Sequence, residues 1–172
     1  MAFHHVAIAT RDLDATHRFY TEAMGFELVK VEAAPTPEPG WARHLFYDTG
    51  NGEMLAVWDL HVPSLDGYRT EISTGLGLPP WVNHIAFDSP DLDDLKIRLE
   101  RWLDHGLECV RIDHGWCTSI YTNDPSGVTV EFCSSTREFT AADRDEAQAL
   151  LAAAKPKLNE TAPEIDFFPA NA

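Results

Sequence analysis

Residues 114–131 read His114-Gly-Trp-Cys-Thr-Ser-Ile-Tyr-Thr-Asn-Asp-Pro-Ser-Gly-Val-Thr-Val-Glu131, and this stretch decides the fold. Thr118–Thr122 is β-branched and aromatic, the next five residues are turn-forming types, and Val128–Cys133 resumes a β-type run. The pattern predicts two strands joined by a tight turn, with Glu131 in the middle of the second strand. A carboxylate among apolar neighbours is costly to bury unless a cation meets it, so Glu131 is the first indication of a metal.

Composition places the chain among globular proteins. Its 172 residues suit one domain or two small modules that share a core, and it is 44% hydrophobic and 24% charged. No apolar run approaches the roughly 18 residues that a membrane span needs, so we expect no membrane partner. The sequence starts without a signal-peptide pattern, and we therefore expect a cytoplasmic protein.

Charge and cysteine content exclude several classes of function. The net charge of −15 argues against a nucleic-acid partner, because phosphate binding needs a basic patch. The three cysteines, Cys109, Cys117 and Cys133, include no close pair. This spacing argues against a disulfide framework and against a zinc site built from thiolates.

The chain contains an internal repeat. His5 and His84 are each followed after eight residues by a leucine between two aspartates, and a helical pattern follows both. Each half predicts a strand, a helix and three further strands; in the first half these lie near 3–10, 13–24, 26–31, 43–49 and 53–60, with a loop at 33–40. We therefore predict module 1 at 1–60, a linker or lid at 61–80, module 2 at 81–135, and a C-terminal helix and acidic tail at 136–172.

The C-terminal segment lies beyond the repeat. Residues 140–154 are rich in Ala, Leu and Glu and predict a helix. The tail ends in Ile165-Asp166-Phe167-Phe168-Pro169, and two exposed phenylalanines would be unusual, so it could dock on its own core or on a partner subunit. A disordered tail is the alternative.

Three polar residues coincide when the repeats are superimposed. His5 and His84 occupy matching positions on the first strands, and Glu131 lies on the last strand of module 2. Two histidines and one carboxylate are the ligand set of a divalent first-row metal with open positions. The position equivalent to Glu131 in module 1 is Ala56, so a fourth ligand is absent. A lone strand histidine is usually structural, but the paired positions favour metal binding; His4, on the opposite face of its strand, is the fallback.

The paired units resemble the vicinal oxygen chelate superfamily over roughly residues 3–135. This superfamily includes glyoxalase I, fosfomycin-resistance proteins, methylmalonyl-CoA epimerases and extradiol ring-cleaving dioxygenases. The opening stretch is similar to the extradiol signature, which is matched by Ile112-x-His114, five residues, Ile120-Tyr121, two residues, Asp124-Pro125-x-Gly127, three residues and Glu131.

The resemblance implies an α+β fold in which two βαβββ modules form an open mixed β-barrel around a metal. His5, His84 and Glu131 would hold Fe(II), with Mn(II), Zn(II) or Ni(II) as alternatives. A catechol-like aromatic substrate would chelate the ion, and O2 would react with it. Tyr121 corresponds to the tyrosine that hydrogen-bonds the substrate, and His114 to a histidine that lines the pocket; the structural alternatives are a strand aromatic and a turn residue.

The sequence departs from the extradiol pattern at one position. The family's acid-base histidine lies early on the last strand of module 1, where this chain has Glu53 or Met54. His44 and His61 lie on nearby segments and are the possible substitutes. Glu53 could instead serve as the base of an isomerase or lyase, although an exposed hairpin residue is its simpler interpretation.

Three functions follow as hypotheses. An extradiol-type dioxygenase leads; a glyoxalase-like isomerase, epimerase or fosfomycin-type transferase would use the metal as a Lewis acid; a bleomycin-resistance-like protein would bind its ligand without catalysis. An aromatic-rich set suits a planar ligand in all three: Trp41, Phe46, Trp58, Trp81, Trp116 and Tyr121. We expect a homodimer, and the sequence leaves open whether the modules pair within one chain or across the dimer.

Overall fold

The computed structural model describes residues 2–158 and 162–171. The first half contains, in order, β1 (His5–Thr10), α1 (Leu13–Arg18), a π-helical turn (Phe19–Ala23), β2 (Glu27–Pro35), β3 (Trp41–Gly50) and β4 (Glu53–His61). The second half repeats this order with β5 (His84–Asp88), α2 (Leu92–Asp104), β6 (Cys109–Asp113), β7 (Cys117–Asn123) and β8 (Thr129–Ser135). Between the halves lie two short 3-10 turns, Pro63–Leu65 and Thr74–Leu76, and after them come α3 (Ala141–Ala152) and β9 (Glu164–Phe168).

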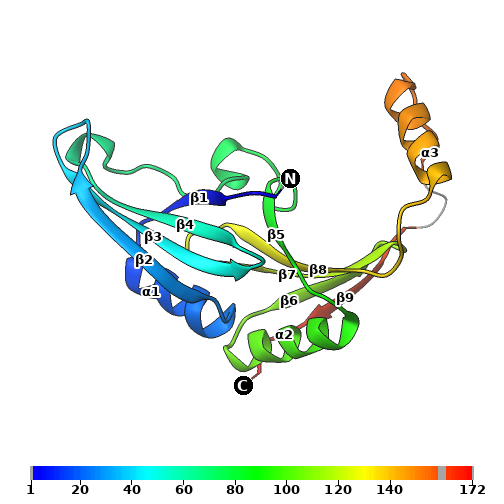
Figure 1. Cartoon of the computed structure of the whole chain (residues 1–172), viewed down its shortest axis with the longest axis horizontal. Helices are drawn as coiled ribbons and strands as arrows, with labels where there is room; N and C mark the ends of the chain where they lie inside the picture. Colours follow the sequence, from blue (N-terminus) through cyan, green and yellow to red (C-terminus); the bar gives the residue numbers. More distant parts are fainter. Residues whose placement is uncertain (1, 159–161, 172) are drawn as a thin grey trace.

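The strands form two mixed sheets that do not close into a barrel. Sheet A has the order β1-β4-β3-β2, and sheet B has the order β5-β8-β7-β6-β9. In each sheet the first strand of the repeat runs parallel to the last, and the other pairs are antiparallel. Figure 1 shows the sheets side by side with α1 and α2 on the same side of the molecule. The predicted α+β class with two βαβββ units and an open arrangement is confirmed.

The strand register makes the repeat explicit. Equivalent rows across the two sheets are Ala7–Ala56–Phe46 and Ala86–Glu131–Tyr121. His5 and His84 each lie two residues before the first member of their row. The two histidines are therefore structurally equivalent, and so are Ala56 and Glu131, as the sequence predicts.

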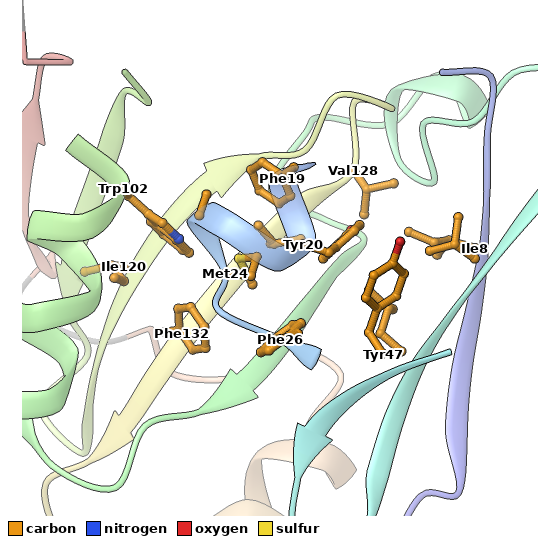
Figure 2. Packing of buried hydrophobic residues seen from close by; sticks show 14 of the residues in the cluster. Ile8, Phe19, Tyr20, Met24, Phe26, Tyr47, Trp102, Ile120, Val128 and Phe132 are labelled. Atoms are coloured by element: carbon orange, nitrogen blue, oxygen red, sulfur yellow. The ribbon is translucent and has the colours of Figure 1, made fainter. Parts of the chain in front are cut away.

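One hydrophobic core lies between the helices and both sheets. Side chains of the α1 region, such as Tyr20 and Met24, lie between Phe132 of sheet B and Tyr47 of sheet A (Figure 2). Trp102 of α2 is fully buried in the same cluster. Both modules therefore contribute side chains to a single core.

The helix predicted at 13–24 is present but changes geometry halfway. Asp12 caps it by accepting a hydrogen bond from Ala15 N at 3.0 Å, and after Arg18 the chain continues as the π-helical turn. The wider turn brings Phe19 and Tyr20 into the core. Gly25, at φ +77°, then leaves the helix with a backbone angle that suits glycine.

The first module also has a longer second strand than the sequence indicates. β2 continues to Pro35, where a loop at 33–40 was expected. Pro35 pairs with Trp41 as the final residue of a strand at the edge of sheet A. A proline is tolerated there because its missing N–H removes no bond from the interior of the sheet. The hairpin turn at Asn51-Gly52 is as predicted, with positive φ at both residues.

A buried polar contact joins the Asp-Pro-x-Gly turn to module 1. The Tyr20 hydroxyl donates a hydrogen bond to Asp124 Oδ2 at 2.9 Å, while Asp124 Oδ1 accepts from the backbone N–H of Ser126 and Val128, each at 2.8 Å. Burial raises the pKa of both Tyr20 and Asp124. The Asp-Pro-x-Gly turn of module 2 is thus hydrogen-bonded to module 1 through Asp124 and Tyr20.

The C-terminal segment ends as an added strand. β9 pairs antiparallel with β6 and becomes the outer strand of sheet B, so the tail docks on its own chain. The predicted helix is α3, which projects from the rest of the molecule (Figure 1) and has no buried residue. No helix in the described parts of the chain is both long and apolar enough to cross a membrane.

Candidate functional site

The predicted site residues lie on the faces of the sheets that point away from the core. Alternation along β8 buries Val130 and Phe132 in the core and turns Glu131 to the other face. His84 and Tyr121 lie on that same face, because Ala86 and Tyr121 are the register partners of Glu131. We call this surface the non-core face of sheet B.

His84 and Glu131 come together on this face. His84 Nε2 lies 3.0 Å from Glu131 Oε2, and the Glu131 side chain is only 6% exposed. The other ring nitrogen, His84 Nδ1, lies 3.2 Å from the carbonyl oxygen of Trp81. Since a carbonyl oxygen can only accept, Nδ1 carries the hydrogen in that bond.

This arrangement calls for a positive charge between the two side chains. With Nδ1 protonated, the neutral ring directs the Nε2 lone pair at a buried carboxylate oxygen. Either a proton on Nε2 or a bound cation removes the repulsion between this lone pair and the carboxylate oxygen. A histidine whose second nitrogen donates to a backbone carbonyl is the usual form of a metal-ligating histidine. The donor atoms therefore fit a divalent cation.

Tyr121 and His114 flank the pair. His114 Nε2 lies 3.2 Å from the Tyr121 hydroxyl, and the Tyr121 ring meets the His84 ring edge to face with centroids 6.0 Å apart. Burial raises the pKa of Tyr121, and the negative charge of Glu131 acts in the same direction. The phenol therefore stays protonated near neutral pH and is available as a hydrogen-bond donor.

These residues open into a cavity of about 860 Å³. Its polar lining includes His84, His114, Tyr121 and Glu108, whereas Trp81 and Phe167 contribute apolar surface. A volume of this size is within the range of small-molecule sites. The sequence did not indicate that β9 would line it.

The third predicted ligand lies on the other sheet. His5 contacts His4, with their Nδ1 atoms 2.8 Å apart, and its ring meets Phe46 and His44 at centroid distances of 5.7 and 6.3 Å. Within residues 2–158 and 162–171, no three His, Cys, Asp or Glu side chains form a group that could hold a metal. The structure thus brings together two of the three predicted ligands, and the role of all three stays a prediction.

His4 and His5 do not diverge as alternation along one strand would require. β1 begins at His5, so His4 lies just before the strand and is free of its alternation. His4 O accepts a backbone hydrogen bond from Met54 N at 3.1 Å. His4 therefore remains close to His5 instead of pointing to the other face.

The possible acid-base residues differ in their contacts. Glu53 Oε1 accepts from Phe3 N at 3.0 Å, and His61 Nε2 lies 2.9 Å from Asp59 Oδ2 with its ring stacked on Trp41. The Glu53 carboxylate and the His61 Nε2 atom are thus both already engaged in contacts with neighbouring groups.

His44 is different, because its buried Nε2 has no hydrogen-bond partner among the described residues. Its ring stacks on Trp58 at a centroid distance of 3.7 Å and faces the same side of sheet A as His5. Burial lowers the pKa of His44, and the charge of His5 lowers it further. Of the two substitutes that the sequence offers, His44 has the free nitrogen.

Comparison with known proteins agrees with this fold. The profile of the Glyoxalase/Bleomycin resistance protein/Dioxygenase superfamily matches residues 2–132. The chain belongs to this superfamily. No curated protein sequence matches the chain. The match ends within β8, so α3 and β9 lie outside the segment that the superfamily profile covers.

Solved structures of the superfamily share the fold. A glyoxylase/bleomycin resistance protein/dioxygenase domain from Frankia sp. EAN1pec is 18% identical with a TM-score of 0.59, covering 78% of this chain and 98% of that one. A fosfomycin resistance protein from Listeria monocytogenes is 20% identical with a TM-score of 0.52, covering 84% and 98%. A lactoylglutathione lyase from Agrobacterium tumefaciens is 20% identical with a TM-score of 0.51, covering 77% and 92%. At these identities the likeness extends to the fold alone.

Proposed function

We propose that the chain is a metal-dependent, extradiol-type dioxygenase that cleaves a catechol-like aromatic substrate with O2. The observation that carries the proposal is the His84–Glu131 pair, held 3.0 Å apart beside Tyr121 and His114 at a cavity. Fe(II), when bound there, would supply the electron transfer that lets a catechol react with oxygen. The superfamily includes dioxygenases, which agrees with this assignment.

The residues of this chain have distinct roles in the proposal. His84 and Glu131 would hold the ion, and the Trp81 carbonyl orients the ring of His84 so that Nε2 faces Glu131. Tyr121 donates a hydrogen bond to a substrate oxygen, and His114 orients the phenol through the 3.2 Å contact. His44, with its free buried Nε2, accepts the substrate proton in place of the missing family histidine.

The proposed site is completed by a second copy of the chain. His5 and His44 lie on sheet A, whereas His84 and Glu131 lie on sheet B, and one core fixes the two sheets relative to each other. β1 and β5 are edge strands, so each leaves one backbone edge of its sheet unpaired. A two-fold dimer that sets sheet A of one copy against sheet B of the other would unite the three ligands, so we propose a homodimer with shared sites.

A glyoxalase-like isomerase or a fosfomycin-type transferase is the second candidate. It is favoured by the absence of a histidine at positions 53 and 54, since Lewis-acid chemistry does not need that residue. Its cofactor would be Zn(II), Ni(II) or Mn(II). A ligand-binding protein without catalysis is the third candidate, and it would need no metal.

Metal content separates these candidates. Protein purified without oxygen should contain near-stoichiometric iron by elemental analysis, and His84→Ala should lose most of it because a ligand atom is removed. His105→Ala, which changes an exposed histidine at the end of α2, is the matched control and should keep its iron.

The outcomes point in different directions. Iron in the wild type, together with oxygen uptake on a simple catechol, supports the dioxygenase. Zinc, nickel or manganese at a His84-dependent site supports the second candidate. A wild-type protein that holds no metal even after reconstitution with Fe(II) would remove the enzyme proposals and leave the binding protein.

A further inference from the structure

The C-terminal strand extends the row of residues that contains the proposed metal ligand. Across sheet B the register partners follow one another as Ala86, Glu131, Tyr121, Val110 and Phe167. Cross-strand partners project from the same face of a sheet, so the Phe167 side chain shares the non-core face with Glu131 and Tyr121. It lies three strands from Glu131, which corresponds to roughly 14 Å.

β9 is anchored through its other contacts, which leaves Phe167 free. Asp166 Oδ2 accepts from Arg111 Nη2 at 2.7 Å and from Nε at 3.0 Å. Phe168 packs against the hydrophobic core, and Asn171 binds the end of α2 through Leu103 O at 3.2 Å. Phe167 itself is 77% exposed although it lines the cavity.

The cavity therefore changes character along its length. His84, His114 and Tyr121 line it near Glu131, whereas Val110, Ile112 and Phe167 supply apolar surface farther across sheet B, with the Glu108 side chain as a polar neighbour at that end. A bare benzenediol bound at Glu131 would be too short to reach Phe167. An exposed aromatic ring at the far end of a cavity is a favourable contact only for a ligand long enough to cover it.

We propose that Phe167 of β9 is a specificity-determining residue, and that the site takes a catechol-type ring bearing an extended apolar substituent that packs on Phe167. This inference rests on the proposed function for the chelating end of the ligand. The contact with Phe167 follows from β9, which lies outside the segment that the superfamily profile covers, whereas Val110 and Ile112 of β6 lie inside it.

The test uses a ligand whose apolar part can be followed without metal. 4-Hexylresorcinol carries the alkyl chain, but its hydroxyls are not vicinal and cannot chelate; resorcinol lacks the chain. Tryptophan fluorescence of the metal-free protein, in which Trp81 lines the cavity, reports binding. We expect the wild type to bind 4-hexylresorcinol well above resorcinol, and Phe167→Ser to weaken 4-hexylresorcinol about tenfold through the loss of buried apolar surface.

Ile165→Ser is the matched control. Ile165 is an exposed apolar residue on the same strand and the same face but does not line the cavity, so its variant should bind as the wild type does. Equal binding of both resorcinols to the wild type, or unchanged binding by Phe167→Ser, would overturn the inference. So would a shift of the monomer–dimer equilibrium in Phe167→Ser with ligand affinity unchanged, because Phe167 would then be a subunit contact.

The two proposals fail separately. If the protein lacks iron, the difference in affinity between 4-hexylresorcinol and resorcinol still tests whether Phe167 binds an apolar substituent. If Phe167→Ser binds 4-hexylresorcinol as the wild type does while the iron protein cleaves catechol, the proposed function is supported and only the role of Phe167 is rejected.

Discussion

At the scale of single residues, neighbouring groups set the orientation of the His84 ring and of the Tyr121 hydroxyl. The Trp81 carbonyl fixes which nitrogen of His84 faces Glu131, and His114 holds the hydroxyl of Tyr121. The sequence predicted roles for His84, Glu131, Tyr121 and His114, because these are the residue types that the proposed chemistry needs. It gave no signal for the Trp81 carbonyl, since any residue type has one.

Removing the Tyr121 hydroxyl should affect turnover more than binding. We expect Tyr121→Phe to keep its fold and its metal, because the hydroxyl contacts His114 and is not among the proposed ligands. Its kcat on the preferred catechol should fall about tenfold to a hundredfold, since one hydrogen bond to the reacting oxygen is lost. Steady-state oxygen uptake with parallel iron analysis measures this. An unchanged kcat with a raised KM would assign Tyr121 to ground-state binding instead.

At the scale of elements, α2 is fastened to sheet B through charge. Asp94 accepts from Ser89 Oγ at 2.6 Å and from Arg98 Nε, and the Arg98 guanidinium lies 4.1 Å above the ring of Phe132. Burial alone would raise the pKa of Asp94, but the hydrogen bonds from Arg98 and Ser89 outweigh it and lower the pKa. Ionised Asp94 therefore stabilises the folded state.

This interaction predicts a defined pH dependence. A carboxyl whose pKa is lower in the folded state stabilises the fold above its unfolded pKa, and that contribution disappears as the pH falls through the folded value. Asp94→Asn should lower the free energy of unfolding by about 1 kcal/mol at pH 7, and the gap from wild type should shrink below about pH 4. Urea unfolding at several pH values measures it.

Glu100→Gln on the same helix provides the control. It breaks the exposed pair with Lys96, whose atoms are 3.8 Å apart, and should leave stability unchanged at every pH. An Asp94→Asn gap that persists unchanged at pH 3 would show that packing, and not charge, holds α2.

Elements also show where sequence reasoning reaches its limit. The apolar residues at 165–168 indicated a tail that could dock on its own chain or on a partner, but no local pattern identifies β6 as the strand it pairs with. β2 extends to Pro35 because the edge of a sheet tolerates proline, and sequence does not show which strand is the edge. The repeat was predictable, since both halves carry histidine, helix, turn and last strand in the same order, with Ala56 and Glu131 each four residues after the turn glycine.

At the scale of the whole molecule, the position of His5 relative to His84 decides how a site can form. The sequence predicts that the two are equivalent, and the register agrees. Equivalence under a repeat does not place them together, because the modules can pair within a chain or between chains. That choice depends on how the shared core packs.

Mixing two inactive variants tests the shared site. His5→Ala and His84→Ala should each be inactive, but co-refolded together they should recover roughly a quarter of wild-type activity, because half of the random dimers would contain one intact site. Oxygen uptake on the mixture measures the recovery. A mixture as inactive as its components, despite confirmed subunit exchange, would place both ligands of each site in one chain.

The added strand β9 has a consequence for solubility. Without it, β6 would end sheet B with an unpaired backbone edge, which is a template for association with other chains. β9 takes that position with Pro163 before it, Pro169 after it, and the carboxylates of Glu164 and Asp166 along it. Prolines and charges oppose further strand pairing, so a protease that removed this strand would convert a protected edge into an aggregation-prone one.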